Sequence, residues 1–312
     1  MSFQITAAFV QQYSANIYML SQQKGSRLRG YCRAETIQGT QKGFDRVGLK
    51  SARKKTTRHE NTPQQDTPHS RRWVQLADYD DGDLIDDLDK IRLLNDPTSE
   101  YMLATAWALG RSMDDTFIAA ADGTAVTGQN ADTSTAFTDG QRIIANDGAG
   151  NSANMNVETL RKMKLRFDQA DVDDSLQRHI AVTGSQLYSL LALTQVTSAD
   201  YNTVKALANG SIDTFMGFKF HRLERLAKQA VSKLGSFANG DFASGSDETN
   251  GFRKVIAWVE PSMIIGIGKD ITGRISERAD KCFSVQTYGS MSLGSVRMEE
   301  VGVVIAFCDE TK

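Results

Sequence analysis

Residues 96–123 read DPTSEYMLATAWALGRSMDDTFIAAADG. Pro97 suits the first helical position, where its missing N–H costs nothing, and the Asp and Thr beside it can cap the first free amides. Apolar side chains recur at helical spacing, and Gly123 provides a stop. A helix of about 25 residues at ~1.5 Å per residue is a rod of roughly 37 Å. The sequence therefore predicts one long helix over residues 97–122, which by itself names no function.

The composition bounds the class of protein. The chain has 312 residues and a formal net charge of −2 at pH 7, so it allows about two domains and has no overall nucleic-acid or membrane signature. It has no apolar run of ~20 residues, and its start lacks the basic and apolar blocks of a secretion signal. Cys32, Cys282 and Cys308 form no CxxC pair, so we expect neither a disulfide framework nor a thiolate zinc site.

Charge is distributed very unevenly along the chain. Residues 26–72 contain twelve basic and four acidic side chains, a net charge of +8. Residues 78–122 contain twelve acidic and three basic side chains, a net charge of −9. Complementary patches can attract copies of one subunit, and head-to-tail contacts can close into rings. Two solvated faces that never meet are the alternative.

The basic segment cannot form a core of its own. Residues 49–70, LKSARKKTTRHENTPQQDTPHS, have no apolar periodicity. The flanking stretches 35–47 and 71–77 can form strands. We predict a long two-stranded arm with a basic tip, which needs a neighbour because an isolated hairpin is marginal in water.

The rest of the chain alternates irregularly between helices and strands. Asn156 can cap a helix with Leu160, Met163 and Phe167, and Gly184 opens another helix. A helical stripe within residues 1–25 predicts a short N-terminal amphipathic helix, and a further short helix is predicted at 199–208. The strands predicted after residue 140 cover residues 141–145, 178–183, 215–222, 253–259, 271–278, 281–288, 292–298 and 301–308. This order predicts an α+β protein rather than a regular βαβ winding.

Patterns that would carry catalysis or bind a metal fail on spacing. Counted from Asp78, the run DYDDGDLIDDLD has glycine fifth rather than sixth and ends in Asp89 rather than Glu, so it does not fit a calcium loop. The sequence around Gly268-Lys269-Asp270 lacks the other residues of a phosphate loop. The histidines have no metal-ligand spacing, and no GxSxG elbow occurs. We expect no enzyme, no cofactor and no metal site.

The basic segment has two competing explanations. Nucleic-acid surfaces usually interleave cations with aromatic side chains or place them on a defined helix. No aromatic residue lies between Lys50 and Arg72. A phosphate-binding tail stays possible, but a subunit-contacting arm explains the basic segment together with the acidic one.

Several stretches, taken in order, resemble the major capsid proteins of tailed bacteriophages. They are RRWVQLADYDDGDLIDDLDKIRLLNDPTSEYMLATAWALGRSMDDTFIAAADG (71–123), LRKMKLRFDQADVDDSLQRHIAVTGSQLYSLL (160–191), GSIDTFMGFKF (210–220), and an ending with KVIAWVEPSMIIGIGKDI (254–271) and VQTYGSMSLGSVRMEEVGVVIAF (285–307). The order of these stretches carries the resemblance, since no single motif is decisive. It covers the chain from about residue 26 to the C-terminus.

The resemblance implies the Hong Kong 97 type fold. That fold has an N-terminal arm, an extended hairpin called the E-loop, a P-domain with a long spine helix, and an A-domain. By pattern these would be residues 1–39 (arm), 40–72 (E-loop), 73–183 (P-domain, spine helix 97–122), 184–291 (A-domain) and 292–312 (C-terminal P-domain strands).

The resemblance also implies a function. The chain would be a virion subunit that assembles in the host cytoplasm into pentamers and hexamers of an icosahedral shell around double-stranded DNA, bound without sequence specificity and without a membrane. The start of the chain leaves no room for the cleaved scaffolding region of some relatives, so we expect a separate scaffolding protein, together with a portal. The sequence leaves open whether a cement protein sits outside the shell. A nucleic-acid-binding or decoration protein of the virion is the alternative.

The expected contacts between subunits join the two charged segments. The cations are at the arm tip and hairpin base: Arg53, Lys54, Lys55, Arg58, Arg71 and Arg72. The carboxylates belong to an adjacent subunit: Asp80, Asp81, Asp83, Asp86 and Asp87. Exposed ion pairs are individually worth ~0–1 kcal/mol, so only a repeated network could matter.

Overall fold

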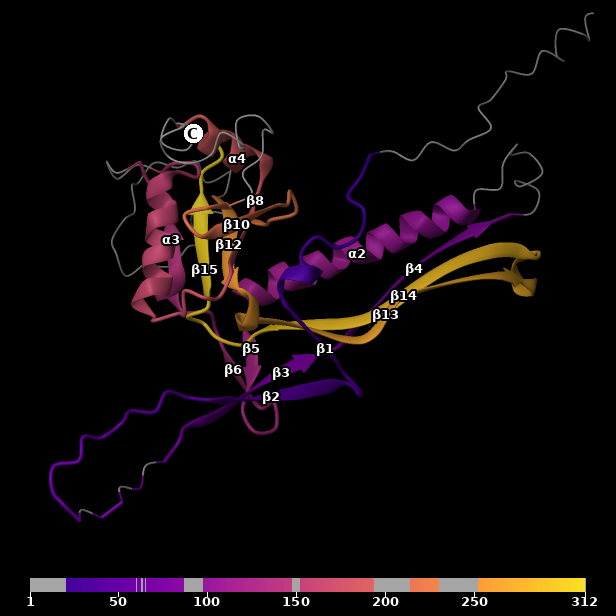
Figure 1. The fold of residues 1–312 in the computed structure, drawn as a ribbon. Helices are drawn as coiled ribbons and strands as arrows, with labels where there is room; N and C mark the ends of the chain where they lie inside the picture. The colour runs from indigo at the N-terminus through magenta and orange to yellow at the C-terminus, as the bar shows by residue number, and fades with distance from the viewer. Residues whose placement is uncertain are drawn as a thin grey trace, which may run out of the picture. The chain divides into compact units, whose positions relative to one another are not determined.

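The computed structural model describes residues 21–59, 61–62, 64, 66–86, 98–147, 152–193, 214–229 and 252–311 (Figure 1). The chain divides into two compact units. The first comprises Met1–Ser26, Ala77–Met113 and Lys269–Leu293, and the second comprises Arg27–Leu76, Asp114–Gly268 and Gly294–Lys312. Helix α2 (Thr98–Asp122) and strands β13 (Met263–Arg278) and β14 (Ser284–Arg297) have residues in both units.

The first unit packs a helix on a sheet. Strand β4 (Ala77–Ile85) pairs antiparallel with β14, and β14 lies next to β13, so that β4 forms the edge. Helix α2 runs alongside these strands (Figure 1). Two glycines permit the close approach: a Cβ at Gly273 would lie 2.6 Å from Met102 Sδ, and one at Gly289 would lie 2.5 Å from Thr105 Cγ2.

A short segment of the first unit, residues 22–26, crosses α2 and is called the strap below. Gly110 allows the crossing, because a Cβ there would lie 2.6 Å from the Cα of Gly25. The Nη1 of Arg111 donates to the Gln22 side chain at 2.9 Å. The strap is therefore held against the middle of the helix by direct backbone contact and a hydrogen bond.

The second unit is built on a seven-stranded sheet in the order β7-β15-β12-β8-β10-β9, with β11 paired to β12. The strands are β7 (Arg142–Ile144), β8 (Arg178–Val182), β9 (Thr214–Phe215), β10 (Phe218–Arg222), β11 (Lys228–Gln229), β12 (Phe252–Val259) and β15 (Val303–Cys308). Helices α3 (Val157–Gln169) and α4 (Gly184–Leu191) accompany it. Strand β1 (Arg33–Thr36) pairs in parallel with the start of β13.

The seven-stranded sheet is covered on both faces. All residues of β8 and β15 are buried, as expected for strands with cover on each side. The apolar stripe of α3, Leu160, Met163 and Phe167, packs with alternate residues of β12 and β15. On the other face, Phe117 of α2 meets Trp258 edge-on with ring centroids 5.1 Å apart. This sandwich is the main core of the second unit.

A buried histidine pair lies beside Trp258. His179 Nδ1 and His221 Nε2 are 3.0 Å apart and share a hydrogen bond. The ring of Tyr31 lies 3.9 Å from that of His221, and Trp258 Nε1 donates to the Tyr31 carbonyl at 2.8 Å. Burial lowers the pKa of each histidine from its ordinary 6.5 to about 4, and the charge of Lys219 adds to this shift. Both imidazoles are neutral at pH 7.

The C-terminal end of α2 is held by a buried cation. Arg297 of β14 is fully buried, and its Nη1 donates to the carbonyls of Ala121 at 2.8 Å and Gly123 at 2.9 Å. These carbonyls are among those that a helix end leaves free, and a cation also suits the negative end of the helix dipole. Asp122 in the same turn forms an ion pair with Lys254 of β12.

A third sheet has four strands in the order β2-β3-β5-β6. Its strands are β2 (Gln41–Val47), β3 (His69–Gln75), β5 (Ala125–Thr127) and β6 (Thr133–Thr135). All four belong to the second unit. The 3-10 turns are η2 (Arg29–Tyr31), η3 (Asp139–Gln141), η6 (Glu260–Ser262) and η7 (Ala279–Lys281).

Most predicted elements are confirmed, and the differences are specific. The long helix and the Asn156 cap occur as predicted. The hairpin predicted from residues 35–47 and 71–77 is formed by β2 and β3, but residues 35 and 36 belong to β1, which pairs with β13. The predicted strand 215–222 is two short antiparallel strands, β9 and β10. The predicted separate strands 281–288 and 292–298 are one strand, β14, and β13 begins at Met263 instead of residue 271. Strand β4 was not predicted, because aspartates are poor strand formers. Residues 77–85 form a strand through their pairing with β14. The predicted N-terminal amphipathic helix and the helix at 199–208 lie outside the described residues.

Replacing Arg297 with Met should lower the free energy of unfolding by about 2–4 kcal/mol, because the freed carbonyls of α2 lose a buried charged donor. Urea unfolding measures the change. Arg161→Met is the control, since Arg161 is exposed and pairs only loosely with Glu158 at 3.7 Å. Equal stability of the two variants would contradict the role given to Arg297.

Stability should fall as the pH drops from 6.5 to about 4. In this window the unfolded chain binds protons at His179 and His221 while the folded chain does not, so unfolding is favoured. The expected loss is on the order of 3 kcal/mol. Denaturant unfolding across this range should show a shallower pH dependence for His179→Gln/His221→Gln than for wild type. Parallel curves would rule the histidine pair out as the cause.

Candidate inter-subunit surface

The hairpin of β2 and β3 carries a projecting loop, residues 48–68. The two strands pair antiparallel from Gln41↔Gln75 to Val47↔His69, and Gly48 N donates to Pro68 O at 2.8 Å, which extends the ladder by one step. Beyond that pair the described residues form no regular structure, and the loop extends away from β2 and β3 (lower left in Figure 1). The arrangement is a paired stem with an irregular tip.

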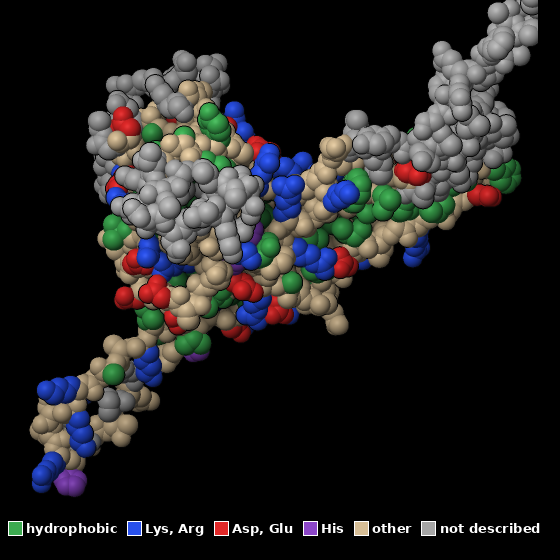
Figure 2. Space-filling view, turned by 45° about the horizontal axis from the view of Figure 1, so that its top comes forward, with side chains coloured by type: hydrophobic (Ala, Val, Ile, Leu, Met, Phe, Trp, Pro, Cys, Tyr) green, Lys and Arg blue, Asp and Glu red, His purple; other side chains and the backbone are tan. Residues whose placement is uncertain are grey.

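The four cations of the tip lie on this loop. Arg53, Lys54, Lys55 and Arg58 are all exposed, and so is the apolar side chain of Leu49. Figure 2 shows Lys and Arg side chains gathered along the projecting loop. The loop therefore presents positive charge to solvent and buries almost nothing within its own subunit.

Arg71 lies on the stem and is paired there. Its Nε lies 2.5 Å and its Nη2 3.2 Å from the carboxylate oxygens of Asp45 on β2. Hydrogen bonding to Arg71 lowers the pKa of Asp45, and the same bond raises the pKa of Arg71. Asp45 is exposed and Arg71 is half-buried, so the pair orients Arg71 without removing its charge from solvent.

Arg72 is committed within its own subunit. It is 1% exposed and forms an ion pair with Glu300, whose carboxylate also lies 3.9 Å from Arg46 and 3.8 Å from Arg297. Burial lowers the pKa of Arg72, and the charge of Glu300 opposes that shift. Arg72 anchors the stem, and the proposal below leaves it out of the contact.

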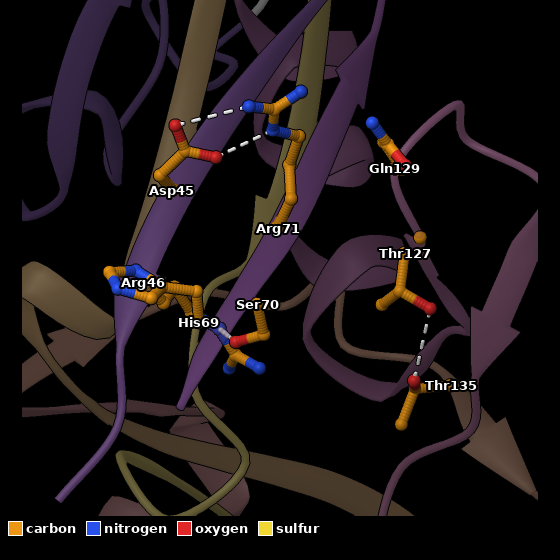
Figure 3. A pocket seen from close by; sticks show the side chains of 9 residues that line it. Asp45, Arg46, His69, Ser70, Arg71, Thr127, Gln129 and Thr135 are labelled. Atoms are coloured by element: carbon orange, nitrogen blue, oxygen red, sulfur yellow. Dashed lines mark hydrogen bonds and ion pairs between the residues drawn. The ribbon is translucent and has the colours of Figure 1, made fainter. Parts of the chain in front are cut away.

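A pocket of about 630 Å³ lies at the base of the loop and is called the stem pocket (Figure 3). Polar and charged side chains from four strands and a turn line most of it: Asp45, Arg46, His69, Ser70, Arg71, Thr127, Gln129 and Thr135, with Gly128. The Thr127 and Thr135 hydroxyls are 3.4 Å apart, and Arg46 Nε donates to Ser70 Oγ at 3.1 Å. The sequence did not predict this pocket, since no local signal joins residues 127–135 to the hairpin.

The predicted carboxylates lie on and just after strand β4 in the first unit. Asp80, Asp81 and Asp83 are exposed on β4, and Asp86 follows the strand and is also exposed. Asp87 lies outside the described residues. Because β4 is an edge strand, its carboxylates also discourage unspecific strand pairing.

The described residues contain no group of three or more His, Cys, Asp or Glu side chains placed to bind a metal. Within the same part of the chain, no helix has the length and apolar character needed to span a bilayer.

Comparison with solved structures shows the fold. The capsid protein of cyanophage P-SCSP1u superposes with a TM-score of 0.73 at 18% identity over 98% of this chain and 94% of that one. Cyanophage Pam1 capsid gives 0.72 at 14% identity (98% and 97%), and the head of Helicobacter pylori bacteriophage KHP40 gives 0.71 at 10% identity (99% and 98%). The fold is thus that of Hong Kong 97 type phage capsid subunits, as the sequence predicted.

The sequence itself gives the family. The model of the family described as "Phage capsid protein" matches residues 5–310. The chain belongs to this family of virion structural proteins and is a major capsid protein. No curated protein gave a significant match.

Proposed function

We propose that this chain assembles into pentamers and hexamers that form an icosahedral shell around double-stranded DNA. Assembly takes place in the host cytoplasm with a separate scaffolding protein, and the shell carries a portal. The subunit performs no catalysis. The family and the fold support this proposal.

One observation carries the proposal most directly: the projecting loop has no core. Ordering a residue costs roughly 1–2 kcal/mol, and this loop buries almost no apolar surface within its subunit to offset that cost. Contacts with an adjacent subunit supply the missing burial and pairing. Interfaces of obligate assemblies commonly bury more than about 2,000 Å².

The proposed contact is electrostatic. Arg53, Lys54, Lys55 and Arg58 of the loop, with Arg71 of the stem, face Asp80, Asp81, Asp83, Asp86 and Asp87 of an adjacent subunit. The pairing of Arg71 with Asp45 fixes where its guanidinium points. Because exposed pairs are weak singly, the contact depends on repetition around the shell.

The domain boundaries belong to the same proposal. The E-loop is residues 40–72, preceded by the arm (1–39). The P-domain is 73–183 with 292–312, and the A-domain is 184–291.

The exposed cations of the loop also suit a phosphate backbone, so nucleic-acid binding is the second candidate. It predicts affinity that falls steeply with salt and protection of residues 50–58 by DNA. A decoration protein predicts small discrete particles without closed shells. Negative-stain microscopy of the expressed chain with its scaffolding protein separates these possibilities.

Reversing the four tip charges (Arg53→Glu, Lys54→Glu, Lys55→Glu, Arg58→Glu) should reduce closed shells at least tenfold while leaving thermal unfolding of the unassembled subunit unchanged. Sedimentation and electron microscopy measure the yield. The control exchanges Arg and Lys at the same four positions, keeps every charge and should assemble normally.

A compensating change makes the test specific. Adding Asp80→Lys, Asp81→Lys and Asp83→Lys to the charge-reversed chain should restore shells. Normal assembly of the charge-reversed chain at physiological salt would refute the electrostatic contact.

A further inference from the structure

Two arginines of the second unit are buried beside a single carboxylate. Arg72 of β3 is 1% exposed and Arg297 of β14 is 0% exposed. One oxygen of Glu300, Oε1, forms an ion pair with Arg72 Nη2 and lies 3.8 Å from Arg297 Nη2. Two guanidiniums that are cut off from solvent therefore approach the same oxygen atom.

Three nitrogens of these two guanidiniums are buried and have no hydrogen-bond partner in the part of the chain that the structure describes: Arg72 Nη1, Arg297 Nε and Arg297 Nη2. The remaining nitrogens are engaged. Arg72 Nε donates to the Met298 carbonyl at 3.4 Å, and Arg297 Nη1 donates to carbonyls at the end of α2. Buried N–H groups in native proteins nearly always have an acceptor, which is either protein or a bound species, so these three indicate a missing acceptor.

The charges around the two arginines do not balance either. The cations of this network are Arg46, Arg72, Arg142, Lys254 and Arg297. The carboxylates paired with them are Asp122, Asp139 and Glu300. Five cations with three carboxylates leave two positive charges, and the C-terminal end of α2 supplies only about half a negative charge.

The arginines cannot remove this imbalance by losing protons. Burial lowers the pKa of both guanidiniums and Glu300 opposes the shift, while the charge of Arg72 lowers the pKa of Arg297 further. Arginine nevertheless keeps its proton in proteins, because its ordinary pKa lies above 12. The missing negative charge must come from another species.

We propose that a monatomic anion of the size of chloride binds between Arg72 Nη1 and the Nε and Nη2 atoms of Arg297. The anion accepts the three unpartnered donors and supplies a charge that the network lacks. A water molecule accepts similar bonds but leaves the charge uncompensated, and an uncompensated buried charge is strongly destabilising. The near-complete burial of both arginines favours a monatomic anion over phosphate or sulfate.

The surroundings of Arg297 are consistent with an acceptor in the plane of its guanidinium. The ring of Phe137 covers one face of the guanidinium, with 4.7 Å between Cζ and the ring centroid. The N–H groups point outward in the plane of the guanidinium, beside the ring. The bound anion would join β3 to β14 and to the end of α2 within one subunit, so this inference does not rest on the proposed function.

Anomalous X-ray diffraction tests the site in the wild-type chain. The full chain is refolded and crystallised in sodium bromide, because bromide replaces chloride and scatters anomalously. We expect an anomalous peak between Arg72 Nη1 and Arg297 Nη2. Electron density without an anomalous signal would identify a water molecule and overturn the proposal. An empty site, or bromide only at the protein surface, would overturn it as well.

The stability of the folded chain provides a second, independent test. Gluconate, which is too large for a closed site, is exchanged for chloride at constant ionic strength during urea unfolding. An anion that binds only the folded chain lowers the unfolding equilibrium constant, and we expect a decrease of at least about fivefold at about 0.2 M chloride.

A matched pair of variants assigns this response to the site. Arg297→Lys keeps the charge but removes two of the three donors, so it should lose most of the chloride response. Arg161→Lys makes the same exchange at an exposed position and should respond as wild type does. No response in wild type, or an equal response in all three chains, would overturn the proposal. Should Arg297→Lys fail to fold, the bromide experiment on wild type decides.

Discussion

A single half-buried carboxylate, Glu300, links the base of the hairpin to the end of helix α2 in the second unit. Its oxygens pair with Arg72 of β3 and lie near Arg297, which in turn binds the last carbonyls of α2. Two largely desolvated guanidiniums thus depend on one anion and on a helix end for compensation. Buried charges of this kind are costly when a partner is lost, so the network fixes the base of the hairpin and the end of the helix in one geometry.

The rigid base explains how the projecting loop, which has no core of its own, can still have a defined direction. The stem is held by Arg72 on its buried face and by the Arg71–Asp45 pair on its exposed face. The tip adds charge but almost no burial. The base is rigid, but the tip has almost no burial of its own to order it, so its ordering depends on contacts with a neighbouring molecule. This suits a protein that functions only in an assembly.

More of the fold than of the candidate site could be predicted from the sequence. Periodicity and capping residues located α2 and α3, because those signals are local. The identity of β4 as a strand depends on β14, about 200 residues later, and no local pattern of Asp78–Ile85 reveals it. The tip cations could be read from composition. The burial of Arg72 could not, since its partner Glu300 is set by tertiary packing alone, and the stem pocket arises where Gly128 ends a strand pairing.

The strap has a mechanical consequence. At Gly25 of the strap and Gly110 of α2 the two backbones meet without intervening side chains. Arg111, also on α2, donates a hydrogen bond to the Gln22 side chain of the strap. Tension applied to the chain ahead of the strap is therefore delivered to the midpoint of α2 and not to either of its ends. A rod loaded at its centre is subject to bending, so a pull on the N-terminal end of the chain would act on the long helix as a bending load.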